Sequence, residues 1–142
     1  MKSSTKAGWQ LDAQIERDTV QVGDLTLCRV RAMNDATYPW VVLVPQRVGA
    51  TEIIDLAEAD RVQLMAEISA GATALKDITR CDKLNIGAIG NLVPQLHIHI
   101  VARRRGDPAW PKPVWGLAPP VAYEPQILDV FVDAVRAAIG IV

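Results

Sequence analysis

The stretch QLHIHIVAR at residues 95–103 decides the fold that the sequence predicts. Polar and apolar residues alternate in its first half, which predicts a β-strand with one buried face. Successive side chains of a strand point to opposite faces, so Gln95, His97 and His99 share one face. The opposite face carries the apolar side chains Leu96, Ile98 and Ile100. We expect this apolar face to pack under helices.

Four further segments show the signals of β-strands. Gly23 and Asp24 separate two β-prone runs, which predicts a hairpin with its turn at these two residues. The run WVVLV lies between two prolines and is typical of a buried strand. With the histidine-bearing strand, the expected strands cover residues 19–22, 25–32, 40–44, 84–89 and 96–102.

Two segments have the periodicity of helices. Residues 57–79 carry apolar side chains three and four positions apart, and so does the segment that begins at Pro125 and ends before Gly140. The resulting order is β-β-β-α-β-β-α with short turns. This order predicts an α+β fold, in which a five-stranded antiparallel sheet is covered by two main helices.

Composition supports one domain and gives no sign of nucleic-acid binding. The 142 residues are 50% hydrophobic and 22% charged, which allows an ample core. We expect a single domain over residues 1–142, with a motif-bearing core at about 19–105, an ordered Pro- and Trp-rich loop at 107–120 and a C-terminal helix at about 125–139. A formal net charge of −1 leaves no broadly basic surface for gripping nucleic acid.

The sequence also favours a cytoplasmic protein. No apolar run approaches the roughly 20 residues of a membrane span, and none follows the N-terminal residues as in a secretory signal. Cys28 and Cys81 are isolated from each other, so we expect two reduced, buried thiols.

His97 and His99 are the two histidines of the sequence. Imidazole suits nucleophilic and proton-transfer chemistry near neutral pH. Three other interpretations compete. The pair could be two exposed histidines without a role. It could bind a metal, but a metal site needs a third ligand, and no His, Asp or Glu follows at short spacing. A Ser-His-Asp hydrolase would require a GxSxG elbow, which the sequence lacks.

The run QLHIHIVAR resembles the histidine-triad signature of the HIT superfamily, in which three histidines alternate with apolar residues. Gln95 stands in the first histidine's place, and His97 and His99 stand in the second and third. The resemblance extends over about residues 25–103.

Three asparagines contribute to the resemblance. Asn34 precedes an apolar strand that ends in proline, as in the family's nucleoside-binding hairpin. Asn85 and the turn at Gly90 and Asn91 precede the triad strand, where family members place ribose- and phosphate-contacting residues. The resemblance implies that Asn34, Asn85 and Asn91 bind substrate, and we add Arg103 as a candidate phosphate contact.

The resemblance implies a nucleotide hydrolase or nucleotidyl transferase acting at an α-phosphate. His97 would attack phosphorus and form a nucleotidyl-histidine intermediate, while His99 would donate a hydrogen bond to a phosphate oxygen. An amide cannot titrate, so Gln95 could position a phosphate or leaving group but could not transfer a proton. The leaving group stays open among phosphoramidates, acyl-adenylates and polyphosphates.

The family's assembly would be a homodimer whose two sheets join into one ten-stranded sheet. No cofactor is expected, and Mg²⁺ would serve only as a counter-ion of the substrate. Two alternatives remain: a nucleotide-binding or regulatory protein with little turnover, and a metalloenzyme that uses His97 and His99 as ligands. Trp110 and Trp115 are expected to pack or to form an interface, and whether one of them borders the substrate pocket stays open.

Overall fold

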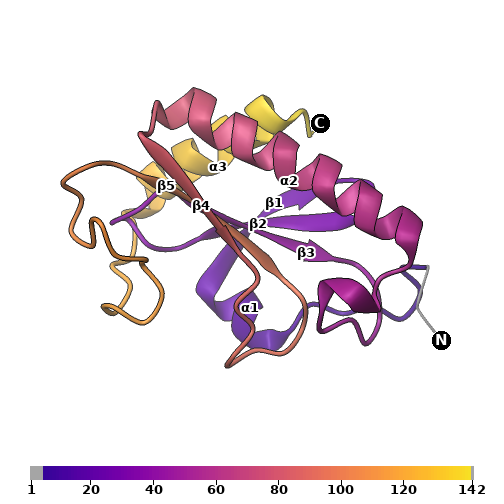
Figure 1. Cartoon of the computed structure of the whole chain (residues 1–142). Helices are drawn as coiled ribbons and strands as arrows, with labels where there is room; N and C mark the ends of the chain where they lie inside the picture. Colours follow the sequence, from indigo (N-terminus) through magenta and orange to yellow (C-terminus); the bar gives the residue numbers. More distant parts are fainter. Residues whose placement is uncertain (1–4, 142) are drawn as a thin grey trace.

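The computed structural model describes residues 5–141 and contains one five-stranded antiparallel sheet (Figure 1). The strands are β1 (Thr19–Asp24), β2 (Cys28–Met33), β3 (Trp40–Pro45), β4 (Lys83–Gly87) and β5 (Ile98–Arg103). They lie side by side in the order β1-β2-β3-β5-β4, and every neighbouring pair is antiparallel. The helices are α1 (Ala13–Asp18), η1 (Ile53–Asp55, a 3-10 turn), α2 (Glu58–Thr79) and α3 (Pro125–Ile139). The predicted α+β fold is confirmed.

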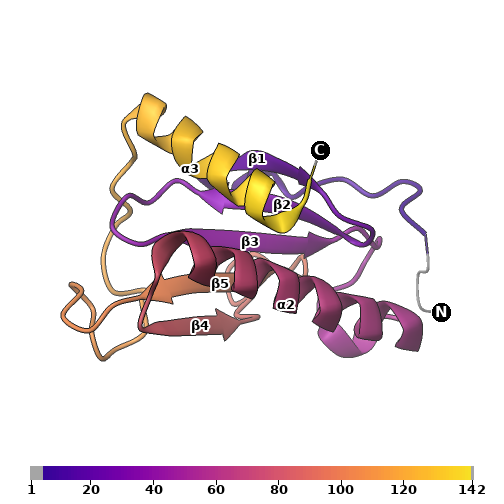
Figure 2. The same cartoon turned by 90° about the horizontal axis from the view of Figure 1, so that it is seen from above.

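The two long helices cover one face of the sheet. Seen from above, α2 crosses the β3–β5 region while α3 lies over β1 and β2 (Figure 2). Apolar side chains from this face and from both helices form the larger core, which includes Val30, Leu43, Ile98, Ile100, Leu64, Leu75, Val132 and Val135. The apolar face predicted for the histidine strand therefore does pack under helices.

The opposite face of the sheet is also covered. α1 lies below the sheet in Figure 1, and the loop that follows β5 contributes further apolar side chains. The second core contains Ile15, Tyr38, Trp40, Val42, Val44, Val101, Ala109 and Val114, with Trp9 and Leu11 packed against it. Because both faces are covered, all six residues of β3 and all six of β5 are buried. The histidines thus lie in an enclosed layer.

Helix α1 is not among the predicted elements. Asp12 caps it, and its carboxylate accepts hydrogen bonds from the backbone N–H groups of Gln14 and Ile15. Six residues are too few for a helical periodicity to emerge from the sequence. The helix is anchored instead by Ile15, which is 5% exposed and packs in the second core.

Several predicted boundaries were wrong: β2 begins at Cys28 and not at residue 25, and β4 ends at Gly87 and not at residue 89. The turn expected at Gly23 and Asp24 belongs to β1, and the chain turns at residues 25–27 instead. A register shift between Gln21 and Gly23 lets the strand continue beyond the glycine. The histidine strand begins at Ile98 and not at residue 96. Before that point the backbone leaves the sheet, and the N–H of Leu96 donates to the carbonyl of Ala50.

Within residues 5–141, no helix is long and apolar enough to cross a membrane. Both cysteines are buried free thiols, as predicted. Burial and the neighbouring Glu67 raise the pKa of Cys28 far above the range of a reactive thiol.

Candidate active site

His97 lies just before β5, where the chain enters the sheet. Its Nδ1 is 2.6 Å from the backbone carbonyl oxygen of Gln95. A carbonyl can only accept a hydrogen bond, so Nδ1 of His97 carries the proton and donates it. The other ring nitrogen, Nε2, therefore holds the lone pair when the ring is neutral.

His99 follows in β5, opposite Val42 of β3 and Gly87 of β4. Its ring centroid is 4.8 Å from that of His97. Its Nδ1 lies 3.0 Å from the indole nitrogen of Trp40, which donates a hydrogen bond to it. Burial, with a smaller contribution from His97, lowers the pKa of His99 to about 3. His99 is therefore a neutral imidazole at neutral pH.

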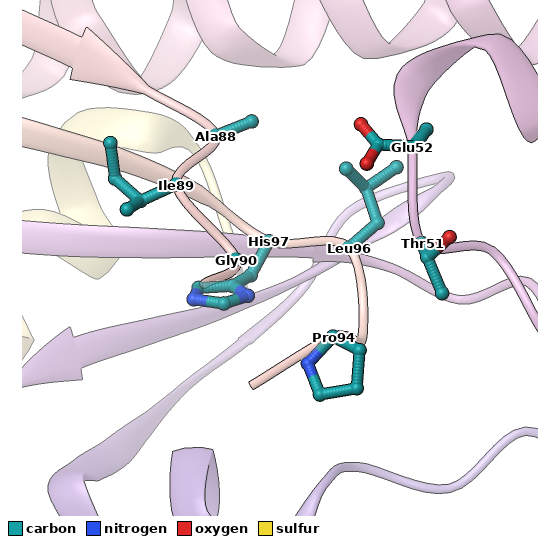
Figure 3. A pocket seen from close by; sticks show the side chains of 8 residues that line it. All are labelled: Thr51, Glu52, Ala88, Ile89, Gly90, Pro94, Leu96 and His97. Carbon is teal, nitrogen blue, oxygen red and sulfur yellow. The ribbon is translucent and has the colours of Figure 1, made fainter. Parts of the chain in front are cut away.

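A cavity of about 220 Å³ opens beside His97 (Figure 3). The connection between β4 and β5 lines it with Ala88, Ile89, Gly90, Pro94, Leu96 and His97, and the segment before η1 adds Thr51 and Glu52. Sites for drug-sized ligands usually enclose about 300–1,000 Å³. This cavity is smaller and can hold only part of a ligand of nucleotide size.

The side chain of Gln95 is directed toward the N-terminal segment. Its Oε1 accepts from the backbone N–H of Asp12 at 2.9 Å, and its Nε2 donates to the carbonyl of Gln10 at 2.8 Å. The carboxamide is thus occupied by backbone, while the carbonyl of the same residue contacts His97. The catalytic role predicted for Gln95 stays a prediction, and its direct contacts are structural.

Arg103 is engaged in a buried polar cluster at the other end of β5. Its guanidinium donates to both carboxylate oxygens of Asp107, at 2.7 and 2.8 Å, and to Oδ1 of Asn85 at 2.8 Å. Tyr38 and Trp110 flank it, each 5.6 Å from ring centroid to guanidinium carbon. The hydrogen bonds from Arg103 lower the pKa of Asp107 to about 2. Because Arg103 is 1% exposed, contact with a phosphate would require this cluster to open.

The other predicted binding residues are dispersed. The side-chain oxygen of Asn34 accepts a hydrogen bond from the backbone N–H of Tyr123 at 2.9 Å, which ties the end of β2 to the segment before α3. Asn91 is exposed and follows Gly90, which lines the cavity. The structure thus brings His97 and His99 together, with Asn91 next to the cavity. It gives Asn34, Asn85 and Arg103 intramolecular partners, and substrate contacts for them stay predictions.

Trp40 belongs to the site although the sequence pattern does not predict it there. In the β3–β5 pairing Trp40 is opposite Val101 and Val42 is opposite His99, so Trp40 and His99 share a sheet face. The alternation of β3 could have revealed this, but only once its neighbour in the sheet is known. The ring of Trp115 packs against that of His99, with 5.6 Å between centroids.

Fold and site together define a class of small α+β proteins in which adjacent imidazoles flank the start of a central antiparallel strand. The model of the HIT domain family matches residues 14–106 of this sequence. The chain belongs to this family, and membership indicates nucleotide-related hydrolase or transferase activity, or nucleotide binding.

Solved histidine triad proteins share the whole fold. One from Bradyrhizobium japonicum is 54% identical, with a TM-score of 0.90 over 92% of this chain and 98% of that one. Another, from Sinorhizobium meliloti 1021, is 40% identical, with a TM-score of 0.92 over 94% and 99%. A third, from Marinobacter aquaeolei VT8, is 40% identical, with a TM-score of 0.91 over 93% and 96%. A comparison with curated proteins finds no match.

Proposed function

We propose that this protein hydrolyses or transfers nucleotides by attack of His97 on an α-phosphate. The observation that carries the proposal is the hydrogen bond between Nδ1 of His97 and the carbonyl of Gln95. It leaves Nε2 as the basic nitrogen of a side chain that lines the cavity. The cavity would receive the end of the substrate that carries the reacting phosphorus.

The reaction would take two steps. The Nε2 lone pair of His97 forms a P–N bond, while the bond from phosphorus to the leaving group breaks and the leaving group keeps the electron pair. Water then attacks phosphorus and forms a P–O bond, losing one proton, while the P–N bond breaks and its electron pair returns to Nε2. His97 is thus released neutral, with a nucleoside monophosphate as product. In the first step the ring becomes positively charged, and the carbonyl of Gln95 stabilises that charge through the Nδ1–H bond. Transfer differs only in the acceptor, which replaces water.

The test is to trap the intermediate. Nucleoside phosphoramidates, acyl-adenylates and dinucleoside polyphosphates labelled at the α-phosphate are mixed rapidly with the protein and quenched in alkali, because phosphohistidine is acid-labile. We expect label on histidine in the wild type and none in His97→Ala, which should lose essentially all turnover while still binding nucleotide. Label accumulating on His97→Ala would refute His97 as the nucleophile.

His99→Ala separates the roles of the two imidazoles. We propose that His99 donates to a phosphate oxygen as charge develops there, and loss of one such donor typically slows turnover about 100- to 1,000-fold. The variant should still trap label on His97. An unlabelled His99→Ala together with a labelled His97→Ala would exchange the two assignments.

A nucleotide-binding protein with little turnover is the second candidate. It is favoured by the carboxamide of Gln95, which cannot titrate and is held by the backbone of Gln10 and Asp12. Calorimetric binding of nucleoside monophosphates without hydrolysis of any of the three substrate classes would establish it.

Metal-independent chemistry is part of the proposal. Among residues 5–141, no group of three or more His, Cys, Asp or Glu side chains is arranged to hold a metal ion. We expect turnover to survive EDTA for substrates that do not need Mg²⁺ as a counter-ion. Stoichiometric zinc or iron that is lost together with activity on chelation would favour the metalloenzyme instead.

We also propose a cytoplasmic homodimer. β4 is an edge strand of the sheet, and its Ile86 is 48% exposed. Val62 and Met65 of α2 are 70% and 62% exposed. A second copy joined along β4 would extend the sheet to ten strands and cover an open edge. The free thiols of Cys28 and Cys81 suit a reducing compartment.

A further inference from the structure

Trp40 makes the hydrogen bond that determines where His99 carries its proton. The indole N–H is a donor and has no acceptor capacity, so Nδ1 of His99, 3.0 Å away, must hold a lone pair. A neutral imidazole has one N–H, which is then on Nε2. Protonation of His99 would place two donors against each other and break this bond.

The donor is held rigidly. Trp40 is the first residue of β3, and it is 8% exposed. Its ring meets His99 edge-on, with 5.6 Å between centroids and an interplanar angle of 64°. The ring of Trp40 also packs against that of Trp115, at an interplanar angle of 90° and with 6.4 Å between centroids. Packing of this kind leaves the indole little freedom to turn away.

We propose that Trp40 is a positioning residue, which holds His99 neutral with its proton on Nε2 and so makes it a hydrogen-bond donor in the ring next to His97, 4.8 Å away between centroids. This inference rests on the proposed function. The two adjacent imidazoles would then have opposite hydrogen-bonding roles at Nε2, one as acceptor and the other as donor, because each is bonded to a different partner through Nδ1. The carbonyl of Gln95 leaves His97 with a lone pair at Nε2, and the indole of Trp40 leaves His99 with a proton at Nε2.

The opposite tautomer of His99 would be harmful. With a lone pair at Nε2, His99 could not donate to the anionic oxygens of a phosphate, which can only accept hydrogen bonds. A donor whose proton is already fixed on Nε2 before substrate arrives needs no reorganisation during the reaction. The lowered pKa of His99 is consistent with this arrangement, since burial also disfavours the charged ring.

Trp40→Phe tests the inference, and Trp115→Phe is its matched control. Both changes remove an indole N–H from a tryptophan whose ring packs against the same imidazole. Only the Trp40 indole is hydrogen-bonded to His99, whereas the buried indole nitrogen of Trp115 has no hydrogen-bond partner among the described residues. A general packing role would make the two variants behave alike.

The first readout is ¹⁵N NMR of the histidine rings without substrate. We expect scalar coupling across the hydrogen bond from the Trp40 indole to Nδ1 of His99 in the wild type and in Trp115→Phe. Trp40→Phe should lose it, and the Nδ1 resonance should shift away from that of a hydrogen-bonded acceptor. A proton on Nδ1 of His99 in the wild type would overturn the inference by itself, even if Trp40→Phe failed to fold.

The second readout is turnover of whichever substrate the wild type hydrolyses. Trp40→Phe should reduce kcat about tenfold or more relative to Trp115→Phe, but by less than the about 100- to 1,000-fold expected for loss of the donor itself in His99→Ala. KM should change by less than about threefold. Equal kcat in a folded Trp40→Phe and in Trp115→Phe would refute the positioning role. Because the NMR readout uses no nucleotide, failure of the proposed function is distinguishable from failure of this inference.

Discussion

The backbone N–H of Asp12 donates to the carboxamide oxygen of Gln95 over 2.9 Å and joins two residues 83 positions apart in the sequence. The same carboxamide donates to the carbonyl of Gln10 at 2.8 Å. Gln95 therefore fixes the N-terminal segment to the chain just before β5. Through its own carbonyl it also holds the ring of His97. Gln95 thus connects residues 10 and 12 of the N-terminal segment to the candidate nucleophile His97.

Gln95→His should not improve the enzyme, although it would complete three alternating histidines. Nδ1 of an imidazole is bonded to the ring carbon next to the chain, so the two nitrogens do not extend side by side from the end of the side chain and cannot reproduce both bonds of the carboxamide. We expect a loss of about 1–3 kcal/mol in the free energy of unfolding and lower turnover. Urea unfolding and initial rates measure the two effects. Gln126→His, at an exposed position of α3, is the control and should change neither. A faster and equally stable Gln95→His would contradict the structural role.

The free energy of unfolding should fall as the pH is lowered through the range in which His99 is protonated in the unfolded chain but neutral in the folded protein. The folded-state pKa of His99 is about 3, below the value of 6.5 for an unperturbed histidine. Between these values the unfolded chain binds a proton that the folded chain does not, so acid favours unfolding. The contribution is complete above pH 6.5 and is lost toward pH 3, with a slope of up to about 1.4 kcal/mol per pH unit.

Urea unfolding of the wild type and of His99→Gln at pH 7, 6 and 5 measures this slope. Glutamine does not titrate, so the variant should lose less stability than the wild type over the same interval. The comparison uses slopes, so a lower stability of the variant at pH 7 does not affect it. Parallel curves for the two proteins would show that His99 titrates normally.

Asp107→Asn should be severely destabilising because it removes one partner of a buried ion pair. Arg103 is 1% exposed, and breaking a buried pair of this kind costs about 3–5 kcal/mol. The exposed pair of Arg136 and Asp133 is the matched control, with side chains 37% and 73% exposed. Asp133→Asn should cost less than about 1 kcal/mol. Urea unfolding of both variants decides, and similar losses would contradict the structural importance of the Arg103 cluster.

Ile86→Lys should weaken the proposed dimer. A lysine on an edge strand opposes pairing with another strand, because joining two copies would bring buried charges together. Light scattering should give about twice the chain mass of 15.5 kDa for the wild type and a mass close to 15.5 kDa for the variant. Ile127→Lys changes an isoleucine of α3 that is 57% exposed, against 48% for Ile86, and should remain dimeric. A monomeric wild type at micromolar concentration would refute the dimer.

Local patterns in the sequence predicted most of the fold. The segments predicted at residues 57–79 and 125–139 match α2 and α3 almost to the residue, since long segments with recurring apolar side chains give the most reliable signal. The alternation around His97 and His99 placed both rings close together, and their centroids are 4.8 Å apart.

The missed features depend on contacts between distant parts of the chain. Helix α1 is one such feature, and the hydrogen bonds of Gln95 to residues 10 and 12 are another. The Trp40–His99 bond spans 59 positions and follows from the β3–β5 register, which a single strand does not specify. The buried cluster around Arg103 could not be predicted either, because a run of three arginines usually belongs to the surface.

Two of the four tryptophans, Trp40 and Trp115, have their rings within 5.6 Å of His99. Indole emission is sensitive to the polarity and charge of its immediate surroundings, so this pair is a built-in optical probe of the imidazole. Arrival of an anionic phosphate at His99 would change the tryptophan fluorescence without any added label. Stopped-flow fluorescence could therefore time binding and turnover in the unmodified protein.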